Sequence, residues 1–261
     1  MNSMIGMAIV LSVFCTLFLT LRAWQCKYNP DPEWVRKLFH LGMGLFTLSL
    51  PWLFASAWPV VVMCVVTVAL LMAIRRSPLL QRKFGAVLGN VARCSHGEMY
   101  FSLGVATLFI WAKNDRVLYL ISILLLTFAD AAAALVGKRF GAHRYPTIGG
   151  HKSLEGSLAF LTVAVACIYV PLALSSNVDA GAALLLALTV ALLLTIIEAI
   201  ASRGLDNLLI PLAAYALLRD LRNWTTDELN TLLVGAVLLT VAFSLATGLH
   251  RFKKHRKGFA A

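Results

Sequence analysis

Long apolar runs recur along the whole chain of 261 residues, and they restrict its fold more than any other feature. An α-helix crosses a bilayer with about 20 mostly apolar residues. Runs of this kind lie at roughly 4–21, 38–54, 57–74, 99–112, 117–137, 154–174, 182–201, 207–218 and 231–249. The fourth and eighth are short for a crossing, so we expect them to be tilted, extended into polar neighbours, or re-entrant. The sequence predicts an all-α, polytopic transmembrane helical bundle of about nine spans.

Composition agrees with a membrane protein rather than a soluble one. Hydrophobic residues make up 60% of the chain and charged residues 13%, whereas soluble domains are about half apolar and a quarter charged. The first run has no basic segment before it and no A-x-A motif after it. This indicates a spanning helix rather than a cleaved signal. Five scattered cysteines without a C-x-x-C pair indicate neither a disulfide framework nor a zinc site.

Basic residues gather in alternate connections between the runs. Nineteen of the 23 Lys and Arg residues fall in 22–37, 75–98, 138–153, 202–206 and the tail 250–261. By the positive-inside rule these segments face the cytoplasm, which places the N-terminus outside and the basic tail inside. Membrane topology therefore accounts for the net charge of +11, and nucleic acid is not an expected partner. We expect a single integral-membrane domain over 1–261, with its motifs between 36 and 211.

Acidic and basic residues also lie at the cytoplasmic ends of the spans. Ionisable groups at this depth are costly, so they tend to face an interior and serve a function. The acids are Glu98, Asp130, Glu155, Glu198 and Asp206, and the bases are Lys37, His40, Arg139, Lys152 and Arg203. The sequence predicts that these groups, distant along the chain, meet in one polar site at the cytoplasmic interface.

The segment 130–157 is a charged, glycine-rich connection between two spans. Asp130, Ala134, Gly137 and Gly141 share one helix face, and small residues there let another backbone approach closely. The glycines before Lys152 and the start of the next helix, with nearby Lys and Arg, are typical of an anion site suited to phosphate. The segment is not a Walker P-loop, because His151 stands where that motif has glycine.

Several of these residues also have purely structural explanations. Lys37 and His40 could anchor a helix at the interface, and Glu98 could complement a helix dipole. Lys152 and Glu155 could form an i, i+3 ion pair, and Ser153 could be an ordinary N-cap. A capping turn explains Gly204 and Asn207, but not the acid Glu198 within an apolar run. His96, His143 and His151 show no metal spacing and are expected at the surface.

Phosphoryl transfer fits these residue types. The reaction depends mostly on positioning and on neutralising phosphate charge with Lys, Arg and a metal ion. Mg²⁺ is usually held by one or two carboxylates together with the substrate phosphates. A carboxylate beside a lipid hydroxyl could act as general base.

The sequence resembles the CTP-dependent polyprenol kinase family, which includes dolichol kinases, phytol kinases and CTP-dependent diacylglycerol kinases. The resemblance covers nearly the whole chain, in order. It rests on Arg36-Lys37 with His40, Gly97-Glu98 with Tyr100, Asp130 through Gly137 to Gly141, the run Lys152–Ser157, and Glu198 with Gly204, Asp206, Asn207 and Pro211. It implies a multi-pass membrane enzyme that transfers the γ-phosphate of CTP to a lipid alcohol such as phytol, another isoprenoid alcohol or diacylglycerol.

The resemblance leads to a residue-level hypothesis. Asp130, Lys152, Glu155 and Asp206 are the expected catalytic residues. Asp130 with Glu198 or Asp206 would hold Mg²⁺, and Glu155 and Asp206 are the leading candidates for the base. Lys37, His40, Glu98 and Arg203 would complete the polar site. The expected nucleotide-binding residues are Gly137, Lys138, Arg139, Gly141, Gly149, Gly150, Lys152, Ser153, Gly156 and Asn207.

Two other functions compete with this one. Cytidylyl transfer from CTP to a phospholipid is a related reaction, but its Pro-Gly-His-Gly-Gly and Asp-Arg-x-Asp signatures are absent from the sequence. An ion-coupled transporter would place its polar groups near the midplane, open to both sides. Here the polar groups gather toward one side, which favours the kinase.

Overall fold

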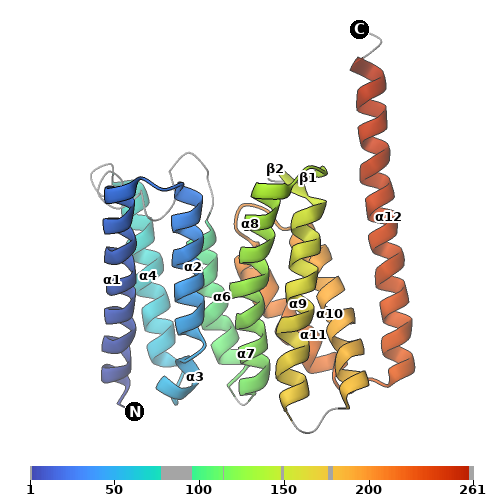
Figure 1. Cartoon of the computed structure of the whole chain (residues 1–261). Coiled ribbons are helices and arrows are strands. Elements are labelled where there is room, and N and C mark those ends of the chain that lie inside the picture. The colour runs from blue at the N-terminus through green and yellow to red at the C-terminus, as the bar shows by residue number, and fades with distance from the viewer. Residues whose placement is uncertain (1, 78–95, 114, 148–149, 176–178, 259–261) are drawn as a thin grey trace. The chain divides into compact units, whose positions relative to one another are not determined.

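A computed structural model describes the chain except residues 1, 78–95, 114, 148–149, 176–178 and 259–261 (Figure 1). Side chains are not described at 33 and 243–258. The chain forms two compact units, which consist of residues 1–131 with 203–215 and of residues 132–202 with 216–261. The chain passes from one unit to the other inside two helices and at the 202–203 connection.

The first unit is a set of packed helices. They are α1 (Ser3–Tyr28), α2 (Pro32–Thr47), α3 (Leu50–Leu53), α4 (Trp58–Arg76), α6 (Gly97–Trp111), α7 (Arg116–Leu124) and the π-helical turn η1 (Leu125–Ala129). Helix α1 contacts α2 and α4, α4 contacts α6, and α2 packs against α7 and η1. The buried Tyr119 ring meets Phe109 edge-on, and its hydroxyl donates to the Thr47 carbonyl at 3.0 Å. This core holds α2, α6 and α7 together.

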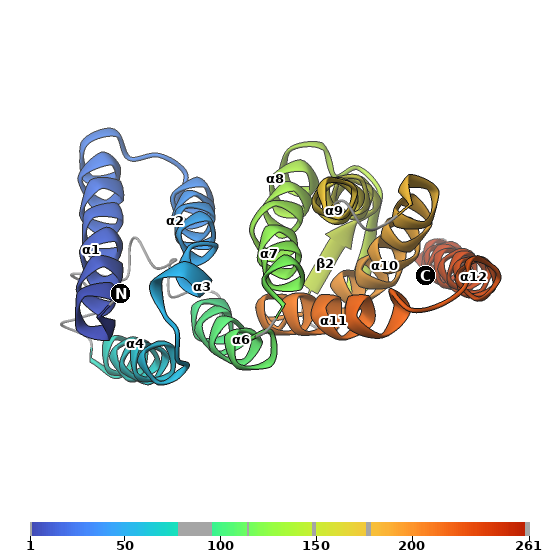
Figure 2. The ribbon, with the colours of Figure 1, turned by 90° about the horizontal axis from the view of Figure 1, so that it is seen from below.

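The second unit combines helices with a small hairpin. It contains α8 (Asp130–Phe140), β1 (Arg144–Thr147), β2 (Gly150–Ser153), α9 (Leu154–Leu174), α10 (Ala180–Ile200), α11 (Asp206–Leu221) and α12 (Thr226–Gly258). The first two residues of α8 and the first ten of α11 belong to the other unit. Figure 2 shows α10 between α9 and α12, and it packs against both. The antiparallel strands pair Tyr145 with Lys152 and Arg144 with Ser153.

Side-chain caps define where several helices begin. The Asp115 carboxylate accepts from the Leu118 amide at the start of α7, and the Asp179 carboxylate accepts from two amides at the start of α10. Ser153 caps α9, because its Oγ accepts from the Gly156 amide at 3.2 Å. Such caps satisfy amide groups that have no partner within the helix. The N-cap interpretation of Ser153 is therefore confirmed.

Helices occur at each of the nine predicted ranges. Five helical stretches within the described residues are long and apolar enough to cross a membrane: α1, α4, the continuous stretch Arg116–Phe140, α9 and α10. Helices α2, α6 and α11 have only 16, 15 and 16 residues. The helical membrane class is confirmed, whereas the number of nine spans and the sidedness of the termini stay predictions. The predicted loop 138–153 instead contains the end of α8 and the hairpin.

The small-residue face of α8 packs closely against α9. A Cβ on Gly137 would lie 2.9 Å from the Ser153 Oγ, and one on Gly156 would lie 2.8 Å from the Ala133 carbonyl. A Cβ on Gly141 would lie 2.8 Å from the Ser153 Cβ. These glycines therefore allow the backbones of α8 and α9 to approach, as the sequence predicted. Their role in packing needs no nucleotide.

Candidate active site

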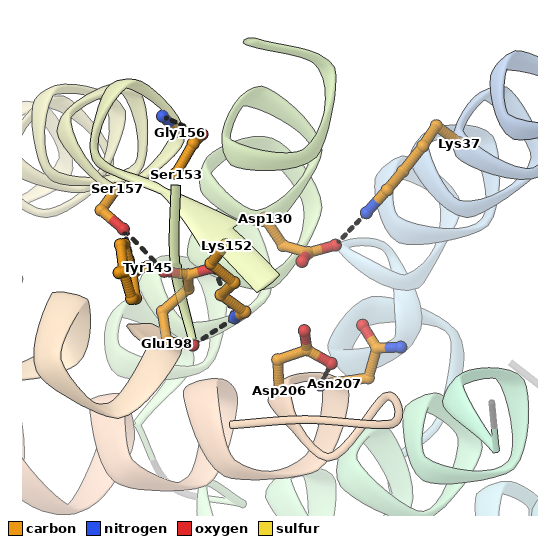
Figure 3. Close-up of polar contacts among 10 residues, drawn as sticks. All are labelled: Lys37, Asp130, Tyr145, Lys152, Ser153, Gly156, Ser157, Glu198, Asp206 and Asn207. Atoms are coloured by element: carbon orange, nitrogen blue, oxygen red, sulfur yellow. Dashed lines mark hydrogen bonds and ion pairs between the residues drawn. The ribbon is translucent and has the colours of Figure 1, made fainter. Parts of the chain in front are cut away.

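A buried ion pair joins α2 to the start of α8 in the first unit. The Lys37 Nζ lies 2.7 Å from the Asp130 Oδ2, and the two side chains are 6% and 8% exposed (Figure 3). Charges removed from water are stable only when they are paired and hydrogen-bonded. The pairing therefore explains how Asp130 is tolerated within an apolar helix. It also shows that Lys37 is not a solvent-exposed anchor.

A π turn directly precedes Asp130 and exposes a carbonyl to His40. The Asp130 amide bonds to the Leu125 carbonyl, five residues back, rather than to that of Leu126. The His40 Nε2 lies 3.0 Å from the Leu126 carbonyl and 3.6 Å from the Asp130 Oδ2. A ring nitrogen donating to this carbonyl helps to hold the turn in place. Single π turns inside α-helices often occur at functional sites.

Close packing keeps α2 on this turn. A Cβ on Gly44 would overlap the Thr127 side chain, so this position requires glycine for the observed approach. The His40 ring also meets the Phe101 ring of α6 edge-on, with the centroids 5.1 Å apart. His40 thus contacts both the turn before Asp130 and helix α6.

The turn before α11 packs on the start of α6. The Asn207 Nδ2 donates to the Gly97 carbonyl at 3.0 Å, and the Arg203 carbonyl accepts from the His96 amide. A Cβ on Gly104 would lie 2.7 Å from the Asn207 carbonyl. The structural explanation of this turn is correct for the backbone. The Asn207 Oδ1 is different, because it is buried and has no hydrogen-bond partner among the described residues.

Glu98 and Arg203 lie at the edge of this region. The Glu98 Oε2 lies 3.4 Å from the Arg75 Nη2 in a partly exposed pair. The Arg203 side chain is exposed, and its backbone has a φ of 55°, which is followed by φ 89° at Gly204. Two consecutive residues with positive φ form the turn between α10 and α11. The structure therefore shows Arg203 as part of this turn, with its side chain exposed.

A second charged pair lies in the second unit, between β2 and the end of α10. The Lys152 Nζ lies 2.6 Å from the Glu198 Oε1 and also donates to the Glu198 carbonyl. The Glu198 side chain is 7% exposed and that of Lys152 is 21% exposed. Glu198, the acid within an apolar run that a capping turn did not explain, is thus the partner of Lys152. The ammonium remains the more accessible member of the pair.

Two hydroxyl groups extend this pair. The Ser157 Oγ donates to the Glu198 Oε2 at 3.4 Å and lies 2.7 Å from the Tyr145 Oη (Figure 3). Burial raises the pKa of Tyr145 to about 12, and the nearby Glu198 charge acts in the same direction. The phenol is therefore neutral at physiological pH.

Glu155 has a different partner from the one considered in the sequence. Its Oε1 lies 2.7 Å from the His143 Nδ1 and 3.0 Å from the His143 amide, and its Oε2 accepts from the same amide at 3.3 Å. The interpretation of an i, i+3 pair between Lys152 and Glu155 is wrong, because Lys152 turns to Glu198. Glu155 instead ties the start of α9 to the connection after α8.

The expected anion site at the start of α9 has fewer available amides than the sequence suggested. The Leu154 amide donates to the His143 carbonyl, and the Gly156 amide donates to the Ser153 Oγ. Phosphate binding here would rest on side chains instead. Lys138 and Arg139 are exposed at the end of α8, and Gly150 is exposed with a φ of 146°. Gly149 and the tail beyond 258 lie outside the described residues.

The residues that the structure describes contain no group of three or more His, Cys, Asp or Glu side chains placed to hold a metal ion. Mg²⁺ coupled to phosphate needs only one or two carboxylates. Asp206 begins α11, and it is followed directly by Asn207, whose buried Oδ1 has no partner in the part of the chain that the structure describes. These oxygen donors fit the hard ligands that Mg²⁺ prefers.

Tyr145, Ser157 and His143 contribute contacts that the sequence did not assign to the site. Ser157 follows the Ser153 cap by four residues, so the helical period indicates a shared face. His143 appeared only as a surface histidine, and it is exposed, but it pairs with Glu155. No sequence pattern indicated Tyr145, because its partner depends on the hairpin register.

Comparisons with known proteins identify a family and several relatives of this chain. The model of the cytidylyltransferase family matches residues 3–203. A phytol kinase from Synechocystis sp. is 30% identical over 184 residues, which cover 70% of this chain and 76% of that protein. The CTP-dependent diacylglycerol kinase 1 of Saccharomyces cerevisiae is 28% identical over 154 residues, or 54% of this chain and 51% of the relative.

A third relative has the same name as the second and comes from another organism. The CTP-dependent diacylglycerol kinase 1 of Schizosaccharomyces pombe is 30% identical over 162 residues, covering 58% of this chain and 71% of the relative. No solved structure matches the chain. The family match spans most of the sequence, and these relatives are named as kinases that include CTP-dependent enzymes. The chain therefore belongs to the cytidylyltransferase family in the sense of that model, and to the CTP-dependent polyprenol kinase family.

Proposed function

We propose that this protein transfers the γ-phosphate of CTP to the hydroxyl group of a membrane lipid alcohol. In this reaction the lipid oxygen forms a bond to the γ-phosphorus, the bond from that phosphorus to the β-phosphate oxygen breaks, and CDP leaves. The names of the relatives support the nucleotide and the lipid acceptor. Five candidate spanning helices support access from the bilayer.

The observation that carries the proposal is the position of Lys152. Its ammonium is held at the end of a glycine-containing hairpin, is partly exposed, and has Glu198 as its acidic partner. A phosphate oxygen can take up a hydrogen bond from this ammonium without leaving a buried cation unpaired. Lys138 and Arg139 are exposed in the last turn of α8 and supply further positive charge. Cationic neutralisation of phosphate oxygens is the main requirement of phosphoryl transfer.

The remaining roles follow from the contacts of each carboxylate. Asp130 and Asp206 would hold Mg²⁺, with the Asn207 Oδ1 as a further oxygen ligand, and the ion would neutralise phosphate charge when bound. Glu198 would orient Lys152. Both oxygens of Glu155 already accept from His143, so Asp206 is the better of the two predicted candidates for contact with the lipid hydroxyl. The meeting of all these groups in a single pocket stays a prediction.

Labelled CTP tests the reaction directly. Purified protein in detergent micelles is incubated with Mg²⁺ and with phytol, geranylgeraniol, polyprenol or diacylglycerol, each in a separate assay. Label at the γ-phosphorus should appear in the lipid product, and label at the α-phosphorus should remain in CDP. ATP is supplied in parallel to test the nucleotide. Absence of lipid phosphorylation with every acceptor would contradict the proposal.

The name of the matching family gives cytidylyl transfer as a second candidate. That reaction would move the α-phosphorus of CTP into the lipid and release pyrophosphate. The same two labels separate the two reactions, provided that phosphatidate is added to the acceptors. Lipid labelled only from α-labelled CTP would replace the kinase with a cytidylyltransferase.

Variants then test the residue assignments. Lys152→Ala and Asp130→Asn should each lower CTP-dependent phosphorylation by at least about 100-fold, a typical loss for removing a group that stabilises transition-state charge. Lys113→Ala is the matched control, because Lys113 is exposed in the turn after α6 and has no assigned role. Activity near the wild-type level in Lys152→Ala or Asp130→Asn would contradict the assignment.

A further inference from the structure

We propose that Tyr145 is a positioning residue for phosphoryl transfer, which acts on Lys152 through Ser157 and Glu198. The inference rests on the proposed function, since it concerns the cation assigned to the CTP phosphates. All four residues belong to the second unit. They come from β1, β2, α9 and α10, so the contact closes a ring across four elements.

The hairpin register places the two ends of this ring opposite each other. Tyr145 on β1 and Lys152 on β2 are direct partners across the antiparallel pair. Side chains of directly opposed residues lie on the same face of a hairpin. Both can therefore reach the same carboxylate on α10, Lys152 directly and Tyr145 through one hydroxyl group on α9. Figure 3 shows Tyr145 and Lys152 on either side of Glu198.

The donors and acceptors give this ring one direction. An ionised carboxylate only accepts, so Ser157 must donate its single hydroxyl proton to the Glu198 Oε2. The Ser157 Oγ can then only accept from the Tyr145 hydroxyl, which lies 2.7 Å away. The order is Tyr145 to Ser157 to Glu198, with Lys152 donating to the other carboxylate oxygen at 2.6 Å. Burial, which raises the pKa of the phenol, keeps its proton in place for this donation.

The order of these hydrogen bonds matters because the residues that form them are buried. Tyr145 is 9% exposed, Ser157 is 9% exposed and Glu198 is 5% exposed. Water cannot readily replace a lost partner at such positions, and buried networks of this kind hold a single arrangement. Without the phenol, Ser157 is free to turn its proton away from Glu198. The carboxylate then loses the restraint that Ser157 provides, and the ammonium that it orients is held less firmly.

Tyr145→Phe tests the proposal, because it removes the hydroxyl and keeps the ring. A single hydrogen bond contributes about 1 kcal/mol, so kcat/KM for CTP should fall about 5-fold. The KM for the lipid alcohol should not change, because the proposed function assigns Lys152 to the CTP phosphates and not to the acceptor. Tyr169→Phe is the matched control, since Tyr169 is a partly buried tyrosine on α9 outside the ring. It should keep the wild-type value.

A double-mutant cycle separates positioning from a general loss of structure. Ser157→Ala interrupts the same series, so the double variant should lose no more activity than Ser157→Ala alone. A purely structural tyrosine would instead lower the thermal unfolding temperature in detergent in step with activity, and losses that multiply would show that Tyr145 does not act through Ser157. Wild-type kcat/KM in Tyr145→Phe, or multiplying losses, would overturn the proposal. If the wild-type protein transfers no γ-phosphate at all, it is the proposed function that fails instead.

Discussion

Breaking the buried Lys37–Asp130 pair should destabilise the protein more than deleting the pair. Both side chains are less than a tenth exposed, and their charged atoms are 2.7 Å apart. Replacing one partner leaves the other charge buried without compensation, at a cost of about 3–5 kcal/mol in the free energy of unfolding. Lys37→Met and Asp130→Asn should each show such a loss. The double variant Lys37→Met/Asp130→Asn should recover most of it, since no lone charge remains.

Unfolding by SDS in mixed micelles, followed by circular dichroism, measures these free energies. Arg75→Met is the control for loss of a cation, because the pair that Arg75 forms with Glu98 is partly exposed and 3.4 Å long. That pair should contribute no more than about 1 kcal/mol.

The two readouts, stability and phosphorylation, distinguish a structural pair from a functional one. The double variant should be nearly as stable as the wild type and still inactive with γ-labelled CTP. A double variant as unstable as the worse single variant would refute the argument from an uncompensated charge. A stable and active double variant would instead remove Asp130 from the catalytic residues.

Three further predictions follow from other contacts. Gly156→Ala should lower the free energy of unfolding by about 1–3 kcal/mol, because the added methyl group would overpack against α8. Gly235→Ala is the control: its methyl group would lie in open space on α12, so the free energy of unfolding should stay the same or rise by up to about 1 kcal/mol. SDS unfolding measures both. The Tyr145 phenol should titrate near pH 12 in the difference between the ultraviolet spectra of wild type and Tyr145→Phe. Because folding raises this pKa, the protonated phenol contributes fully to stability below about pH 10, and this contribution is lost as the pH rises toward 12. Asp206→Asn should lower kcat by about 100-fold or more while Glu155→Gln keeps most of it, and the reverse order would identify Glu155 as the base.

The helices were largely predictable from the sequence. An apolar run shows where a helix can cross a membrane without any knowledge of its neighbours, and the predicted 154–174 and the observed α9 coincide. The hairpin was not predictable, because its four-residue strands contain Pro146, glycine and charged residues and show no apolar alternation. Its pairing depends on contacts with α9 that a local pattern does not carry.

The members of the site were easier to predict than their partners. Costly charges within or at the ends of apolar runs identified Asp130, Glu198 and Lys37, and all three are buried. Which cation meets which carboxylate is set by packing over separations of 93 and 46 residues. The π turn depends in the same way on the His40 ring and on the contact between Gly44 and Thr127. Helical periodicity alone therefore could not predict the direction of Asp130 relative to the residues before the turn.

The π turn also makes the length of this span matter. A helix with one i→i+5 turn holds one residue more than a regular helix between the same end points. Deleting a single residue between Leu125 and Ala129 would leave a regular helix between the same end points, with its flanks in nearly the same orientation. The Leu126 carbonyl would then accept from an amide of its own helix and would lose its contact with His40, whereas Asp130 would stay opposite Lys37. The extra residue of this span is thus what leaves a backbone acceptor for another helix.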